Sequence, residues 1–235
     1  MSIITKSLIS FSLLATPCLA NESYFSTGYG SSTYEIDGYA YLDSDGGNGG
    51  NGISLYSRDA ASLSGPQFSY SRKLDDIYTY SLSYSSMEGD GVQRDEVSIS
   101  LMRPLTSSLS GAVGIYNSKT DISHEMFVLS PDAAIDNLSL FGSLQTNFPL
   151  GQTAFGFARI SYQMGDADIT SEGKTSPTEP SGASFSFGGM MPIGNNNFFE
   201  LSYDIKDIEY ENTLADGGSP EEDFTSLRAA FSMQF

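Results

Sequence analysis

The stretch Leu227-Arg-Ala-Ala-Phe-Ser-Met-Gln-Phe235 closes the sequence and decides the fold. Every second residue counted back from the last one is apolar: Phe235, Met233, Phe231, Ala229 and Leu227. A period of two is that of a β-strand, whose successive side chains point to opposite faces. An apolar edge of this kind would promote aggregation in water, whereas a lipid-facing strand of a closed barrel has no free edge. The stretch therefore predicts a strand that touches hydrocarbon on one face.

This pattern resembles the closing strand of Gram-negative outer-membrane β-barrel proteins, of the porin-like and OmpA-type class. In that class the terminal aromatic residue is recognised by the barrel-assembly machinery. The resemblance implies an outer-membrane location, with lipid and glycolipid as neighbours. It also implies an assembly signal made of the apolar face: Leu227, Ala229, Phe231, Met233 and Phe235.

The first twenty residues have the composition of a secretory signal peptide. Lys6 precedes the apolar run from Leu8 to Ala15, and small residues end the segment at Ala20. The run is shorter than the ~20 residues that a membrane-spanning helix needs. We therefore expect residues 1–20 to be the signal peptide and residues 21–235 to form a single barrel domain. Cys18, the one cysteine, would leave with the signal, so no disulfide is expected.

Composition agrees with a barrel and excludes some partners. Mean hydropathy is only -0.18, which suits a barrel because alternate residues alone face lipid. The 14 tyrosines and 15 phenylalanines provide aromatic side chains for the two membrane interfaces. The formal net charge of -18 repels nucleic acid, so no nucleic-acid partner is expected.

A repeated turn sets the number of strands. Proline occupies the same place in Arg103-Pro-Leu-Thr106, Phe148-Pro-Leu-Gly151 and Met191-Pro-Ile-Gly194. Proline cannot donate to a strand ladder, so these segments mark strand ends, and a fixed repeat marks one recurring unit. With a fourth turn at Lys73-Leu-Asp-Asp76, the chain predicts an all-β fold. We expect a closed antiparallel transmembrane β-barrel of about ten strands, with short periplasmic turns and long extracellular loops.

The segment from Asp37 to Leu63 leaves alternatives of twelve and eight strands. Its two short alternating pieces, Tyr39 to Leu42 and Ile53 to Tyr56, flank a glycine-rich run. We interpret the segment as one long first loop with a small hairpin above the membrane. Two extra membrane strands would raise the count to twelve, and eight would require two expected strands to be wrong.

The polar faces of the strands should line the lumen. Five charged residues are expected there: Arg159, Glu200, Asp204, Lys206 and Arg228. Unpaired charges are costly where water is scarce, so these side chains should pair across the interior or face water. Two functional hypotheses follow. The lumen is either filled by mutually satisfied side chains or forms a narrow pore for small solutes or ions, with its selectivity set by these charges.

The expected extracellular loops are acidic. The fifth, from Glu209 to Asp223, carries six carboxylates, and the first carries Asp37, Asp43, Asp45 and Asp59. These loops indicate a solvated surface, with divalent cations as candidate ligands because carboxylate oxygens suit calcium and magnesium. Such ions would bridge the loops to glycolipid phosphates. The run from Asp43 to Gly52 lacks the spacing of a calcium loop and is expected to be a flexible connection.

No catalytic, cofactor or metal site is expected. The single histidine, His124, lies beside Ser123 and Glu125, and sequence adjacency does not create a Ser-His-acid unit. We therefore expect a surface histidine and no enzyme. The leading hypothesis is a structural or surface-interaction protein acting through acidic loops, and a diffusion channel is the alternative. The sequence does not indicate an oligomeric state.

Overall fold

The computed structural model describes residues 23–41, 52–57, 59–75, 77–126, 131–194, 196–212 and 219–235. The predicted signal peptide lies outside these residues, as does most of the glycine-rich run of the first loop. Within the described residues no helix is both long and apolar enough to cross a bilayer.

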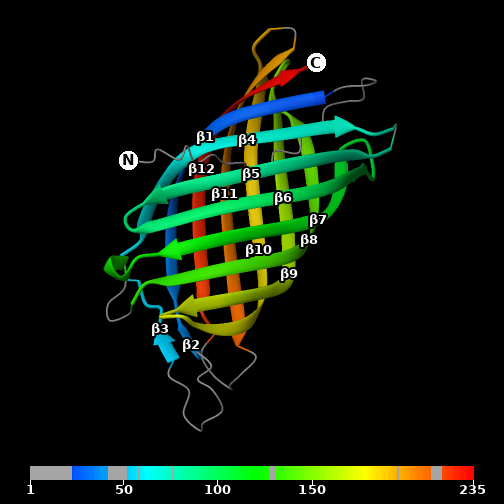
Figure 1. The fold of residues 1–235 in the computed structure, drawn as a ribbon. Helices are drawn as coiled ribbons and strands as arrows, with labels where there is room; N and C mark the ends of the chain where they lie inside the picture. The colour runs from blue at the N-terminus through cyan, green and yellow to red at the C-terminus, as the bar shows by residue number, and fades with distance from the viewer. Residues whose placement is uncertain are drawn as a thin grey trace.

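Within the described residues, ten antiparallel strands close into one barrel, in the order β1-β12-β11-β10-β9-β8-β7-β6-β5-β4 (Figure 1). Pairing of β1 with both β12 and β4 closes the ring. The strands are β1 (Ser23–Asp37), β4 (Ala61–Lys73), β5 (Thr79–Gly89), β6 (Val92–Pro104), β7 (Leu109–Ile122), β8 (Ala133–Pro149), β9 (Phe155–Ser171), β10 (Lys174–Pro192), β11 (Asn197–Asn212) and β12 (Glu221–Gln234). The prediction of an outer-membrane-type β-barrel with ten strands is confirmed.

Period-two alternation sorts the side chains as expected. In β8, Leu138, Leu140 and Leu144 are exposed on the outer surface, while Asn137 and Ser139 are buried inside. In β12, Leu227, Phe231 and Met233 are exposed, while Arg228 and Ser232 are buried. Exposed apolar side chains all around a closed sheet form the lipid-facing belt of a membrane barrel. This belt, on an even-stranded antiparallel barrel, is that of an outer-membrane protein.

The four repeated turns share one hydrogen bond. In each, the N–H of the residue at the strand end donates to the carbonyl four residues later, over 2.8 Å. The four pairs are Leu74 with Tyr78, Leu105 with Leu109, Leu150 with Ala154, and Ile193 with Asn197. The sequence repeat therefore corresponds to one turn geometry at the end of the barrel that holds the chain terminus.

The opposite end differs from the expectation of five long loops. Two of its connections are two-residue turns, Asp90-Gly91 between β5 and β6 and Glu172-Gly173 between β9 and β10. All four residues have positive φ, between 45° and 80°, as a tight hairpin turn of this hand requires. The loops are short because the strands are long. β10 has 19 residues, although a membrane crossing needs ~10.

The first loop contains the small hairpin that its sequence predicts. β2 (Tyr39–Tyr41) pairs with β3 (Gly52–Ser54) as a separate two-stranded sheet. Figure 1 shows this hairpin beyond the end of the barrel opposite to the carboxyl terminus. The hairpin is tied to β1, since Leu55 N–H donates to Gly38 O at 2.9 Å and Ser57 N–H donates to Ile36 O at 3.0 Å. The alternatives of twelve and eight barrel strands are therefore excluded.

Candidate functional site: the barrel interior

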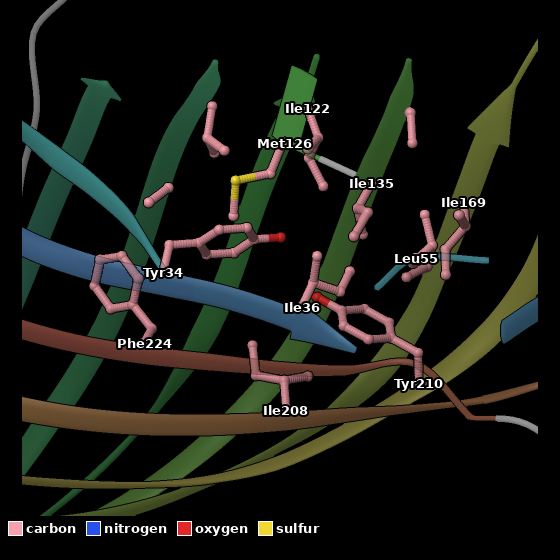
Figure 2. Close-up of a cluster of buried hydrophobic side chains, with 14 of the residues drawn as sticks. Tyr34, Ile36, Leu55, Ile122, Met126, Ile135, Ile169, Ile208, Tyr210 and Phe224 are labelled. Atoms are coloured by element: carbon pink, nitrogen blue, oxygen red, sulfur yellow. The ribbon is translucent and has the colours of Figure 1, made fainter. Parts of the chain in front are cut away.

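An apolar layer fills the extracellular end of the interior. Inward-facing side chains from the strand ends meet there, and the labelled ones in Figure 2 point into one common space. Its largest fully buried members are Tyr34, Tyr210, Ile36, Leu55, Leu63, Ile122, Ile135 and Ile169. The layer includes Ala40 and Leu55 of the first loop, both 0% exposed. The hairpin thus caps the barrel mouth. The sequence did not predict this layer, because the inward faces were expected to be polar.

Within the apolar layer, an ion pair crosses the lumen at the level of Ile36 and Ile208, which lie opposite Glu222 in the sheet. Arg94 of β6 and Glu222 of β12 come from strands that are not neighbours in the ring, and their side chains meet at 3.0 Å. Glu222 also accepts hydrogen bonds from Tyr34 Oη at 2.8 Å and from Tyr210 Oη at 2.6 Å. We call these four residues the clamp: Tyr34, Arg94, Tyr210 and Glu222.

The clamp is almost free of solvent and well satisfied. Arg94 and Glu222 are each 1% exposed. Arg94 also donates from Nε to Glu96 at 2.9 Å and from Nη1 to Thr120 at 2.8 Å. Its guanidinium lies 5.5 Å from the Phe224 ring centre, within cation–π range. A buried ion pair persists only when further hydrogen bonds satisfy its remaining donors and acceptors, and here they do.

A second group of charges lies closer to the middle of the barrel. Lys206 Nζ lies 3.6 Å from the Tyr116 ring centre and 3.9 Å from Glu96 Oε1. Arg159 Nη2 lies 3.8 Å from Asp204 Oδ1 and donates to Ser186 Oγ at 3.3 Å. Both ion pairs are longer than a direct hydrogen bond, unlike the pair in the clamp.

These loose pairs border a cavity of about 140 Å³ in the middle of the lumen, which we call the chamber. Seven serines line it, and so do Glu96, Arg159, Asp204 and Lys206. Its place follows from burial along single strands. In β11, Asp204 and Lys206 are half-buried, while Ser202 below them and Ile208 above them are buried. The chamber is thus bounded by filled layers along the barrel axis.

All five charged residues that the sequence assigns to the lumen lie on inward-facing positions. The chamber holds Arg159, Asp204 and Lys206. Arg228 and Glu200 pair with each other closer to the periplasmic end, and each is 1% exposed. The Arg159–Asp204 pair and the Arg228–Glu200 pair each join side chains on two different strands. The structure therefore brings the five residues into two groups along the lumen.

Glu222 corrects the sequence interpretation of the fifth loop. That loop was expected to expose its carboxylates, but Glu209 and Glu211 lie on β11 and Glu221 to Asp223 lie on β12. Strand alternation turns Glu222 inward, where it is 1% exposed. Arg94, Tyr34 and Tyr210 were also missed. Strand alternation could have predicted the position of Glu222, because it lies an even number of residues from Ser226 and Arg228 and therefore on the same inward face.

The outer surface above the lipid belt is acidic. On five strands the outward-facing apolar side chains give way to an aspartate, and we call these residues the acidic collar: Asp95, Asp136, Asp166, Asp207 and Asp223. Asp207 lies directly opposite Asp223 in the sheet, and Asp136 opposite Asp168. Within the described residues, however, no three acidic or histidine side chains form a group that would hold a metal ion.

His124 lies in a short 3-10 helix, His124–Met126, between β7 and β8. Its Nδ1 lies 3.0 Å from Asp132 Oδ1, and the side chains of His124 and Asp132 are 66% and 76% exposed. The His124 backbone N–H also donates to Asp132, which lowers the pKa of that carboxyl. Among the described residues, no serine hydroxyl is hydrogen-bonded to the His124 ring. The pair is a loop contact in water and lacks the arrangement of a catalytic triad.

Four of the five residues of the predicted assembly signal lie on the outward face of β12, and Phe235 follows directly after the strand. Leu227, Phe231, Met233 and Phe235 are between 38% and 68% exposed. The Phe235 N–H and carbonyl each bond with Ser23 at 3.0 Å, which continues the seam between β12 and β1 to the last residue. Recognition by the assembly machinery remains an expectation from the sequence.

No family model and no curated protein matches this sequence. Solved structures of other barrels are similar in fold. Neisserial surface protein A is 12% identical, over 87% of this chain and 95% of its own, with a TM-score of 0.40. The outer membrane protein OprG from Pseudomonas aeruginosa is 10% identical, over 92% and 96%, with a TM-score of 0.39. Ail of Yersinia pestis is 10% identical, over 92% and 100%, with a TM-score of 0.34.

Proposed function

We propose that this outer-membrane barrel is closed to diffusion and acts at the cell surface through its acidic extracellular end. The observation that carries the proposal is the clamp. An ion pair with 1% exposure on each partner, joining non-neighbouring strands, leaves no room for a solute between them. The apolar side chains packed around the clamp strengthen this barrier, because hydrated ions do not cross a filled apolar constriction.

The exposed end carries the features of a contact surface. The acidic collar draws on five of the ten barrel strands and lies just above the lipid belt, where we place the phosphates and sugars of the glycolipid. We propose that divalent cations bridge the collar to those phosphates, since hard cations prefer oxygen ligands. A structural role in the outer leaflet then requires only that the barrel stay closed.

A gated channel is the second candidate, and one observation favours it. The chamber shows that the middle of the lumen is not filled, although a purely structural plug needs no such space. Displacement of the clamp and the capping hairpin would connect the chamber to the outside. We propose no enzymatic activity, because the His124 ring contacts an exposed aspartate and no hydroxyl among the described residues, and the Tyr116 hydroxyl that donates to Glu96 in the chamber belongs to a buried side chain.

Planar-bilayer recording of the refolded full-length barrel separates the two functions. We expect the wild type to be electrically silent. An Arg94→Ser, Glu222→Ser double variant should show intermittent conductance steps, because it removes both charges of the ion pair that closes the lumen and leaves Glu96 paired with Lys206. A Lys119→Ser, Asp121→Ser variant, which removes an outward-facing pair, should stay silent. Steady ion-selective steps from the wild type would overturn the closed-barrel proposal and establish a channel.

A further inference from the structure

The charged side chains of the chamber wall are not in direct contact, and a barrel that is simply closed does not require such separation. A plug that only blocks diffusion is most stable when its charges are in contact or replaced by apolar side chains. Here the two ion pairs at the chamber wall are held apart at 3.8 and 3.9 Å, while the clamp above is joined at 3.0 Å. An N···O separation beyond about 3.5 Å is not a direct hydrogen bond, and a third polar group beside the pair can contact both atoms.

The charges that face the chamber are balanced. Its lining contains two cations, Arg159 and Lys206, and two carboxylates, Glu96 and Asp204. An anion alone would be attracted to the cations and repelled by the nearby carboxylates, and the reverse holds for a cation alone. A molecule with both charges compensates both halves at once. The serine hydroxyls add both donors and acceptors.

The spacing of the charges suits a very small molecule. Asp204 and Lys206 are two residues apart on the same face of β11, so their Cα atoms lie ~6.6 Å apart. An ammonium group at Asp204 and a carboxylate at Lys206 can therefore belong to one molecule the size of an α-amino acid. Gln163, 7% exposed, also lines the chamber, and its Nε2 has no hydrogen-bond partner in the structure.

We propose that the chamber is a binding site for a small zwitterionic solute. The carboxylate of the solute accepts hydrogen bonds from Lys206 and Arg159, and its ammonium group donates to Asp204. The cavity of about 140 Å³ admits a molecule of only a few heavy atoms. Because filled layers bound the chamber along the axis, the solute enters when one of those layers opens, and its exchange is slow.

Glycine is the probe that tests this site. The full-length barrel is refolded in detergent with radiolabelled glycine, and retained label is measured after rapid gel filtration. We expect saturable retention of one glycine per barrel, prevented by excess unlabelled glycine. Acetate and methylammonium, which each carry one of the two charges, should not prevent it at the same concentration. Glycerol should not prevent it either, because it carries no charge.

Two matched pairs of variants locate the site. Asp204→Asn and Lys206→Met should each reduce glycine retention roughly tenfold or more, since each removes a charge-assisted hydrogen bond. Lys119→Met and Asp121→Asn change the same residue types at the same spacing on the outer face of β7 and should retain glycine fully. The wild-type competition profile tests the proposal even where a chamber variant fails to fold. Absence of saturable retention, equal competition by acetate, or equal loss in the outer-face variants would overturn it.

Discussion

At the residue scale, the interior is organised by a few buried ionic side chains. Arg94 and Glu222 would be expensive to bury separately, since desolvation of each charge costs several kcal/mol. They are retained together because two tyrosines, Thr120 and Glu96 supply the additional hydrogen bonds. The pair therefore fixes how β6 and β12 face each other across the lumen.

A double-mutant cycle tests this account. Arg94→Met leaves Glu222 as a buried carboxylate without its cation, so the free energy of unfolding should fall by about 3–5 kcal/mol. Adding Glu222→Leu removes that remaining charge, so the double variant should lose less than the sum of the single losses. Urea unfolding in lipid vesicles, followed by tyrosine fluorescence, gives these values.

The exposed Lys119–Asp121 pair is the control for this cycle. Its side chains are 49% and 47% exposed, so the same substitutions there should change the free energy by at most ~1 kcal/mol. Additive losses at Arg94 and Glu222, or losses as small as at the control, would show that the clamp does not act as a unit.

At the element scale, the four periplasmic turns reverse the chain direction with two kinds of residue at the same position. The second residue of the turn is glycine in two of them, with φ of 99° at Gly151 and 111° at Gly194. Asp75 and Thr106 hold the same place and instead accept hydrogen bonds from backbone N–H groups further along the turn. Aspartate and threonine commonly make such local bonds in turns.

Asp75 should show this in its titration. The Ile77 and Tyr78 N–H groups each donate to its carboxylate at 2.7 Å and thereby lower its pKa below the ordinary 3.8. A lowered pKa in the folded state means that the stabilisation is complete above pH 3.8 and is lost as the pH falls through the lower folded value. In an NMR titration, the amide shifts of residues 77 and 78 should report a midpoint below 3.8. Asp75→Asn should abolish the transition, and a midpoint at or above 3.8 would contradict the assignment.

Sequence periodicity predicted the elements but not all of the interior. Proline spacing located the turns, and alternation located the lipid face, because both are local signals. The clamp was missed because Glu222 lies in the charged run Glu221-Glu222-Asp223. Its composition suggests a loop, and three charged residues in a row show no alternation between an inward and an outward face. Pairing of Glu222 with Arg94 depends on barrel closure, which brings together residues 128 positions apart. No local pattern carries that information.

At the scale of the whole molecule, charge is distributed unevenly. The chamber lining is electrically balanced, whereas the whole chain carries a formal net charge of -18. The excess negative charge thus lies outside the chamber, and the acidic collar shows part of it on the extracellular surface. Like charges directly opposite in a sheet, as in Asp207 and Asp223, are destabilising unless something neutralises them.

Divalent cations at the glycolipid boundary would supply that neutralisation. We therefore expect Mg²⁺ to raise the melting temperature of the wild type in vesicles that contain lipopolysaccharide. At tenfold excess over its dissociation constant, binding adds ~1.4 kcal/mol, or roughly 3–6 °C for a chain of this size. An Asp207→Asn, Asp223→Asn variant should lose most of this increase and be more stable than the wild type after chelation, because the opposed charges are gone.

Asp75→Asn removes a carboxylate from the periplasmic end and should keep the full increase. An equal increase in vesicles without lipopolysaccharide would show that the ions bind the collar alone, and no increase in either vesicle would contradict the bridging role.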